Sequence, residues 1–136
     1  NAHIKNHNAA LKDFNKVIEI NPSHERAYFN RGVTKTHLND YNGAISDYNK
    51  SIEINPNNEN AFYNRATTKS FLKDYKGALQ DYNKTLEINP AFVDAYYNRG
   101  VMKMYLNDMD GAYLDFDKAS DLGDKIAAQF IERYWK

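Results

Sequence analysis

The stretch Glu25–Asn58 reads ERAYFNRGVTKTHLNDYNGAISDYNKSIEINPNN, and it returns 34 residues later. The second copy, Glu59–Phe92, matches the first at 19 of 34 positions without a gap. Val93 begins a third copy, and Ile4–His24 fits the second half of an earlier one. A fixed period of this length indicates one supersecondary unit that stacks on copies of itself. The sequence therefore predicts a single repeat domain, divided into residues 1–24, 25–58, 59–92, 93–124 and 125–136.

Each unit has the pattern of two helices. Its apolar and small residues recur at spacings of three and four, which is the period of an α-helix. Asn39 and Asp40 interrupt this pattern, and Asp40 can cap a second helix that begins near Asn42. Asn55 and Pro56 end the second helix, because proline restricts the residue before it and has no backbone N–H to donate. Each unit is thus predicted to be an antiparallel pair of helices, and the fold class is predicted to be all-α.

Columns of equivalent residues explain how the two helices of a pair can pack. One kind of column holds small residues, which let the helices approach closely: Gly32, Ala66 and Gly100, and Ala44, Ala78 and Ala112. The other kind holds aromatic rings that fill the volume beside them: Tyr28, Phe62 and Tyr96, and Phe14, Tyr48, Tyr82 and Phe116.

These units resemble tetratricopeptide repeats at six positions with the family's spacing: Gly32, Leu38, Tyr41, Ala44, Tyr48 and Pro56. The resemblance covers nearly the whole chain. It implies an α-solenoid, a right-handed superhelix of helix hairpins whose first helices line a concave groove. The sequence departs from the family's pattern in two columns. The usual tyrosine is replaced by Lys35, Lys69 and Lys103, and the commoner leucine is replaced by Arg31, Arg65 and Arg99.

The second helices carry an aspartate in every unit that can pair with the arginine and lysine columns of the first helices. Arg31 and Lys35 are four residues apart and share a helix face, and Asp47 falls at a fixed place in the same unit. We expect each aspartate to meet an arginine or lysine of a neighbouring first helix. Such pairs fix the register of the helices and are not expected to do acid–base chemistry. The predicted ladder comprises Arg31, Lys35, Asp47, Arg65, Lys69, Asp81, Arg99, Lys103 and Asp115.

The two ends depart from the repeat. Residues 1–7 are expected to form the tail of a first helix, with Ile4 in the Leu38 column, and Asn8–Ile20 to form a second helix without its mate. Either a further helix precedes this one, or another molecule covers its face.

At the other end, Gly123 suits a helix terminus and Asp124 can cap a further helix. Lys125–Tyr134 is then expected to be a C-terminal capping helix, which such stacks need for solubility. The period places Phe130 in the Tyr28 column, where it should pack on the third unit. It places Tyr134 in the Gly32 column, where its ring would block a further helix.

The groove implied by the resemblance holds an asparagine and two aromatic residues in every unit. An asparagine side chain donates and accepts at once, so a row of them can pair with an extended peptide backbone, and the aromatic rings would add contact area. The alternative is that the asparagines stabilise neighbouring helices and the tyrosines cover the seams between units. Arg26, Asn60 and Asp94, and Thr36, Ser70 and Met104, would lie in the same groove. The predicted peptide-binding residues are Phe29, Asn30, Val33, His37, Tyr63, Asn64, Thr67, Phe71, Tyr97, Asn98, Val101 and Tyr105.

Composition argues against several other functions. The 18 basic residues balance 18 acidic ones, so neither a nucleic-acid partner nor an anionic membrane surface is favoured. No apolar run approaches the ~20 residues of a membrane span. The chain has no cysteine, and the pair His3 and His7 has no third ligand in sequence, so neither a metal nor a cofactor is expected. The absence of cysteine identifies no compartment, and a cytoplasmic location is the default expectation. Because the chain begins with Asn1, any targeting signal is expected to lie upstream.

The predicted function is therefore that of a non-catalytic scaffold that holds a peptide or helical segment of another protein. Co-chaperones of this family grip the acidic tail of heat-shock chaperones with two lysines, two asparagines and an arginine. Only Asn64 matches that clamp, because its other places hold Phe29, Val33, Asp94 and Asn98, so this partner is not expected. Two alternatives stay open: self-assembly through the uncapped Asn8–Ile20 helix, and service as the non-catalytic arm of a larger enzyme.

Overall fold

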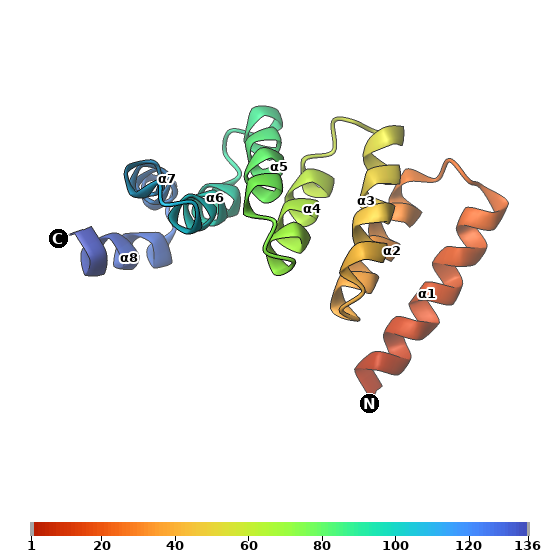
Figure 1. Cartoon of the computed structure of the whole chain (residues 1–136). Coiled ribbons are helices and arrows are strands. Elements are labelled where there is room, and N and C mark those ends of the chain that lie inside the picture. Colours follow the sequence, from red (N-terminus) through yellow and green to blue (C-terminus); the bar gives the residue numbers. More distant parts are fainter. Residues whose placement is uncertain (1, 136) are drawn as a thin grey trace.

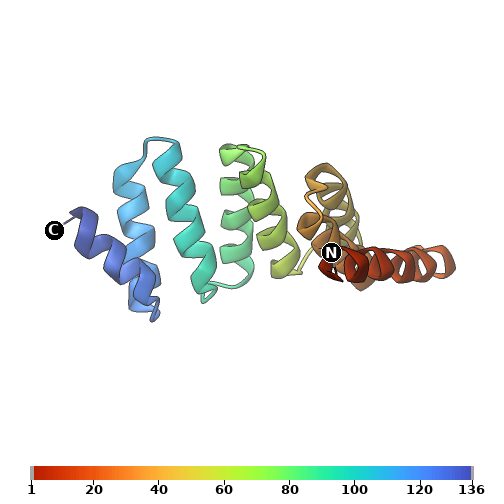
Figure 2. The same ribbon diagram turned by 90° about the horizontal axis from the view of Figure 1, so that it is seen from below.

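The computed structural model describes residues 2–135, and these form eight α-helices and no strand. Three hairpins lie in a row, with α1 at one end and α8 at the other, so the two termini are far apart (Figures 1 and 2). The fold is the predicted α-solenoid. The helices are α1 Ala2–Ile20, α2 Glu25–His37, α3 Tyr41–Ile54, α4 Glu59–Phe71, α5 Tyr75–Ile88, α6 Val93–Tyr105, α7 Met109–Asp121 and α8 Lys125–Trp135.

The turn inside each hairpin uses the same two devices. A residue in the left-handed region follows the first helix: Asn39 has φ 62°, and Lys73 and Asn107 take the same conformation. The next residue is an aspartate that caps the second helix, as when the Asp40 carboxylate accepts a hydrogen bond from Gly43 N at 3.1 Å. This confirms the cap predicted at Asp40.

The expected break near residue 7 is wrong, because α1 runs without interruption from Ala2 to Ile20. In the three hairpin turns a glycine follows the capping aspartate by three positions, and a β-carbon on Gly43 would lie 2.7 Å from the carboxyl carbon of Asp40. At the equivalent places α1 has Asn6 and Ala9, so the aspartate and glycine that the three hairpin turns share are both missing there. The backbone groups are satisfied instead by continuing the helix. Ile4 consequently plugs no turn and is 50% exposed.

The predicted register of the last helix is also wrong. α8 starts at Lys125 as predicted, where the Asp124 carboxylate accepts from Ile126 N at 2.9 Å, but this start lies two residues before Ala127, the place that the 34-residue period gives a first helix. Ala127 is fully buried and takes the place of Ala27 in the first hairpin. Phe130 therefore stands in the asparagine column of the first helices, and not beside Tyr28. Its ring still packs on the third hairpin, 4.8 Å from that of Phe116, as expected.

The core of each hairpin is one ring from the second helix packed against a small residue of the first. Tyr48, Tyr82 and Phe116 are almost fully buried. A β-carbon added at Gly32 would lie 2.8 Å from the Tyr48 ring, so the small residue sets how closely the two helices approach. Every unit is built on the same contact, which is why the hairpins repeat in space as they do in sequence.

Burial of these rings predicts a loss of stability in alkali. Desolvation raises the pKa of Tyr48, Tyr63 and Tyr82 above the ordinary value of a tyrosine. Above about pH 10 the unfolded chain releases these phenolic protons while the folded chain keeps them, so the free energy of unfolding falls as the pH rises. We expect Tyr82→Phe to reduce that slope by up to about 1.4 kcal/mol per pH unit. Urea unfolding between pH 8 and 11 measures the slope, and Tyr105→Phe, at an exposed ring, is the matched control.

Candidate interaction surface

The first helices of the hairpins, α2, α4 and α6, lie with α8 along the inner side of the curved row (Figures 1 and 2). Two open cavities lie on this concave face. The larger, of about 590 Å³, lies between the N-terminal ends of α2 and α4, and we name it the amide pocket. The smaller, of about 430 Å³, lies between α6 and α8, and we name it the apolar pocket. The surface is therefore polar near the first hairpin and apolar near the last helix.

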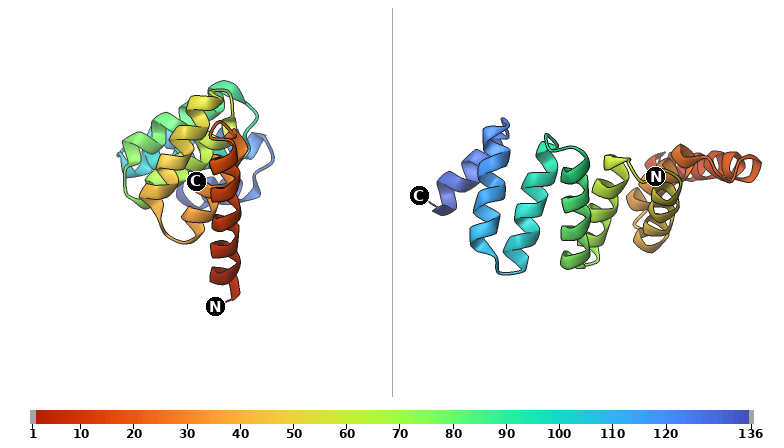
Figure 3. Two further views of the ribbon diagram at one scale, coloured as in Figure 1. Left: turned by 90° about the vertical axis from the view of Figure 1, so that its right-hand side faces the viewer. Right: turned by 90° about the horizontal axis from the view of Figure 1, so that it is seen from above.

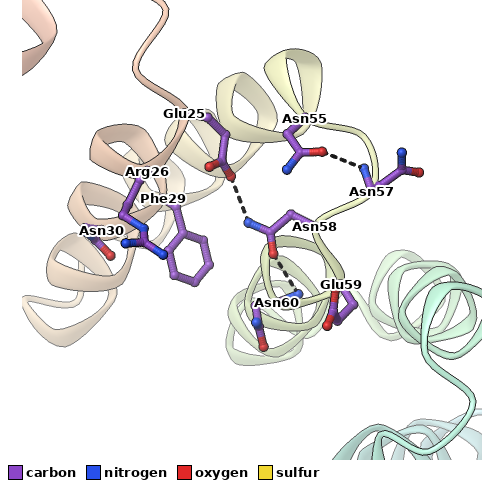
Figure 4. Close-up of a pocket in the computed structure, with 9 residues that line it drawn as sticks. All are labelled: Glu25, Arg26, Phe29, Asn30, Asn55, Asn57, Asn58, Glu59 and Asn60. Atoms are coloured by element: carbon purple, nitrogen blue, oxygen red, sulfur yellow. Dashed lines mark hydrogen bonds between the residues drawn. The ribbon is translucent and has the colours of Figure 1, made fainter.

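Asparagine side chains dominate the amide pocket (Figure 4). Asn58 caps α4 by accepting from Asn60 N at 3.1 Å and donates its amide hydrogen to Glu25 at 2.8 Å. Glu25 also accepts from Ser51 at 2.8 Å, which ties the wall of the pocket to α3. The lining residues are Glu25, Arg26, Phe29, Asn30, Asn55, Asn57, Asn58, Glu59 and Asn60.

At one column of the amide pocket, an asparagine is replaced by an aromatic residue in the next repeat. Asn58 and Phe92 occupy the same column. In the next repeat the Phe92 ring stacks on Tyr63, with centroids 4.8 Å apart, and fills the equivalent space. Asn58 turns instead towards Glu25, so one side of the Phe29 ring faces the pocket. The third hairpin thus shows what the amide pocket looks like when an aromatic ring occupies it.

The apolar pocket is lined by Tyr97, Val101, Met104, Tyr105 and Phe130. The first four were placed in the groove by the repeat pattern. Phe130 joins them only because α8 begins two residues early, which turns its ring to the concave side. The exposed rings and methyl groups here offer contact area without any charged side chain.

Two of the three predicted groove asparagines already donate hydrogen bonds within the protein. The Asn98 amide donates to the Tyr63 hydroxyl at 2.8 Å, which links α6 to α4. The Asn64 amide donates to the Asn60 carbonyl at 2.8 Å. Asn30 lies in the wall of the amide pocket. Asn98 therefore has the structural role weighed from the sequence, and Asn30 lines a cavity, where its pairing with a peptide stays a prediction.

The predicted aromatic residues pack across seams and also face solvent. One column stacks on the preceding repeat: the Tyr75 and Tyr105 rings lie 4.4 Å apart and nearly parallel, and the Tyr41 and Phe71 rings lie 5.3 Å apart. His37 repeats this contact with His7 at 5.2 Å. The other column leans on the buried ring of its own hairpin, in the pairs Phe29 with Tyr48, Tyr63 with Tyr82, and Tyr97 with Phe116.

The remaining predicted column borders these rings. The Thr67 hydroxyl lies 2.8 Å from the Tyr82 hydroxyl, and the Val33 carbonyl lies 2.9 Å from His37 Nδ1. Neither Val33 nor Thr67 lines one of the two named pockets. The pockets thus bring together only part of the predicted set, and they add residues from the loop after α3 that the pattern of the first helices does not contain.

The predicted ionic residues meet within each hairpin. Arg31 binds Asp47 through two nitrogens, at 2.6 and 2.8 Å, and Lys35 Nζ lies 3.0 Å from the same carboxylate. The hydrogen bonds to Asp47 raise the pKa of Arg31 above its ordinary value, although burial acts in the opposite direction. The same geometry recurs in the other two hairpins, in the groups Arg65, Lys69 and Asp81, and Arg99, Lys103 and Asp115.

The sequence reasoning missed a fourth member of each ionic group. Arg31 Nη1 also donates to the Asn15 side chain of the preceding helix, at 3.0 Å. Each arginine therefore joins two consecutive second helices, its own through aspartate and the preceding one through asparagine. Asn49 and Asn83 repeat the role of Asn15, so their constant place in the period was the available signal.

Two further features bear on the class of function. Among residues 2–135, no three histidine or acidic side chains come close enough to hold a metal ion. Within the same range, no helix is both long and apolar enough to cross a membrane.

Comparisons with known proteins agree with this geometry. Models described as tetratricopeptide repeat or TPR repeat match residues 2–24, 25–58, 47–80 and 72–104. No curated protein sequence matches the chain significantly.

Among solved structures, the chain is similar to the crystal structure of MamA, with a TM-score of 0.83 and 19% identity over 86% of this chain and 68% of that one. MamA 41-end from Desulfovibrio magneticus RS-1 is similar with a TM-score of 0.81 and 19% identity, over 89% of this chain and 68% of that one. The first TPR of Spaghetti (RPAP3), solved bound to an HSP90 peptide, is similar with a TM-score of 0.76 and 23% identity, over 80% of this chain and 88% of that one. At these identities the likeness establishes the fold alone.

Proposed function

Because the chain belongs to the tetratricopeptide repeat family, we propose that it is a non-catalytic scaffold whose concave groove holds a peptide or helical segment of a partner protein. The observation that carries this proposal is the pair of open cavities on the concave face. A related domain, the first TPR of RPAP3, was solved with a bound peptide, which supports the class of ligand.

The two pockets would hold different parts of the partner. The amide pocket offers donors and acceptors from asparagine side chains and one exposed cation, Arg26, beside the Phe29 ring. It suits a polar stretch of backbone that carries one planar side chain, in the position that Phe92 takes on Tyr63. The apolar pocket suits a large aliphatic or aromatic side chain of the same segment.

An acidic chaperone tail fits this groove poorly. At the four remaining clamp places, where related co-chaperones present three cations and an asparagine, this chain has Phe29, Val33, Asp94 and Asn98. A terminal carboxylate would meet no cation at these places, and Asp94 would repel it. We therefore propose that the partner is not selected through a terminal carboxylate at these positions.

Filling the amide pocket from within tests the proposal. We expect Asn58→Phe to place a ring on Phe29 as Phe92 lies on Tyr63, and so to occlude the pocket. The loss of the Asn58 cap should cost only about 1 kcal/mol, because Phe92, at the equivalent place before α6, provides no side-chain cap at all. Capture of partners from a lysate of the source cells, with the wild-type chain as bait, is expected to recover a partner that Asn58→Phe holds at least about tenfold less tightly.

The control carries the same added ring elsewhere. Gln80 is exposed on α5, a second helix, so Gln80→Phe adds an aromatic side chain away from the groove. Partners should bind the Gln80→Phe variant as they bind wild type. If Asn58→Phe retains every partner while its helicity is intact, binding does not use the amide pocket and the proposal fails at this site.

A further inference from the structure

The open face of α1 lacks a neighbour that every complete hairpin has. Four columns of the second helices are buried in each hairpin, as shown by Ala44, Asp47, Tyr48 and Ser51 in the first and by their equivalents in the others. In α1 the same columns hold Ala10, Asp13, Phe14 and Val17, and none of the four is buried. Among residues 2–135, α1 packs mainly on α2, at the end of the row (Figures 1 and 3).

Asp13 differs strongly from its equivalents in the complete hairpins, which points to a missing neighbour. Its equivalents Asp47, Asp81 and Asp115 are each 3 to 4% exposed and each bind one arginine and one lysine. Asp13 is exposed and forms no ion pair within residues 2–135. The other side of α1 is docked as in a full repeat, because Asn15 accepts from Arg31 at 3.0 Å. α1 thus packs on α2 as a second helix packs on the next repeat, but its Asp13 face has no first helix packed against it among residues 2–135.

The complete hairpins show what chemistry covers this face. The arginine that binds the aspartate is followed directly by a small residue, which lies against the aromatic ring of the second helix. The lysine follows four positions after the arginine, on the same face. The covering helix therefore reads arginine, small residue, two variable residues, lysine, and it does so three times: Arg31-Gly32 with Lys35, Arg65-Ala66 with Lys69, and Arg99-Gly100 with Lys103.

We propose that the open face of α1 docks an α-helix with this pattern, its arginine bound to Asp13 and its small residue packed against the Phe14 ring. The charge complementarity is specific, because a buried carboxylate tolerates an arginine held at both oxygens far better than an apolar or acidic neighbour. This interaction surface is separate from the concave groove, and it selects its partner by a pattern within one helix.

A second copy of this chain does not offer that pattern at its free end. In the register of the first helices, α8 presents Ile131, Glu132 and Trp135 where the arginine, the small residue and the lysine should stand. Stacking α8 of one molecule on α1 of another would bring Glu132 towards Asp13. Two α1 helices placed back to back would bring together two Asp13 carboxylates. Like charges at a closing interface are unfavourable in both arrangements.

A grafted helix tests the proposal directly. The sequence of residues 59–74 is placed before His7 in place of residues 1–6, which supplies Arg65, Ala66 and Lys69 together with their turn. We expect Asp13→Asn to shift the melting temperature of the present chain by no more than about 2 °C. In the grafted chain the same substitution is expected to lower it by at least about 5 °C.

The matched control changes the grafted arginine to glutamine, after which Asp13→Asn should have no further effect, as a double-mutant cycle requires. Equal effects of Asp13→Asn in all backgrounds would show that no helix docks on Asp13, and would overturn the proposal. Sedimentation of the present chain gives a second check. A dimer at micromolar concentration that is weakened by Phe14→Ser would show that a second copy covers the face, and would overturn the proposal equally.

Discussion

Asp81→Asn is expected to lower the free energy of unfolding by about 3 kcal/mol, because it removes one partner of a buried ion pair and leaves the other charges uncompensated. The Asp81 carboxylate is 4% exposed and accepts hydrogen bonds from Arg65 Nη2 at 2.7 Å and Arg65 Nε at 2.8 Å, with Lys69 Nζ at 3.0 Å. An asparagine there would leave two half-buried cations without their counter-charge. Urea unfolding followed by circular dichroism at 222 nm measures the change.

The position of Asp81 adds a second expected effect. Arg65 also donates to Asn49 at 2.8 Å, so it joins the first and second hairpins. In a stack where each unit contacts only its neighbours, weakening the central seam separates the unfolding of the two ends. We therefore expect the unfolding transition of Asp81→Asn to broaden as well as to move to lower urea concentration.

The control for Asp81→Asn is Glu87→Gln. Glu87 forms an exposed pair with Lys84 at 3.4 Å three residues away on α5, and such surface pairs contribute at most about 0.5 kcal/mol. We expect Glu87→Gln to unfold like the wild type. Equal stability of Asp81→Asn and Glu87→Gln would show that the ionic groups do not hold the hairpins together.

The hairpins were predictable from sequence because each local signal agrees with the packing. A capping aspartate, a proline after the second helix and a small residue opposite an aromatic ring recur together at 34-residue intervals. The ionic groups were predictable because the Arg31 and Lys35 columns depart from the family's pattern together, and the Asp47 column recurs with the same period. Because the unit recurs three times, the same contact can be inferred from three sets of residues, whereas a single copy would offer only one.

The two ends were not predictable from the period, because there the period no longer describes the chain. Asn6 and Ala9 replace the aspartate and glycine of the hairpin turns, and α1 continues through this place as one helix. α7 ends one residue early and the turn after it is one residue shorter, which moves α8 by two residues and carries Phe130 from one face to another. Small local changes of this kind alter which side chains face the groove, although they leave the fold unchanged.

In the candidate groove, too, the role of one residue could not be predicted from the repeat pattern. The first helices predicted which rings and amides would face inward, and Phe29, Asn30 and Tyr97 do line the pockets. Asn58, in the loop before α4, lines the amide pocket, whereas its equivalent Phe92 packs on Tyr63 in the next repeat. The exchange of asparagine for phenylalanine between two copies was visible in the sequence, but its consequence required knowing where that residue points.

Gly100→Leu is expected to be the second severe substitution, lowering the free energy of unfolding by about 3 kcal/mol through overpacking. A β-carbon at Gly100 would already lie 3.0 Å from the Phe116 ring, and that ring is fully buried, so it has no room to retreat. The rest of a leucine side chain would push α6 away from α7. Asn98→Ala, two residues earlier on the same helix, removes one hydrogen bond to Tyr63 and should cost about 1 kcal/mol.

Gly100→Ala refines this test of the packing. Ala66 holds the equivalent place in the second hairpin and is fully buried there, so the fold accommodates one methyl group at this contact. We expect Gly100→Ala to be much milder than Gly100→Leu, with thermal melting ranking the variants as Gly100→Leu least stable, then Asn98→Ala and Gly100→Ala. If Gly100→Leu melted together with Asn98→Ala, the close approach of α6 and α7 would not be the contact that holds the third hairpin together.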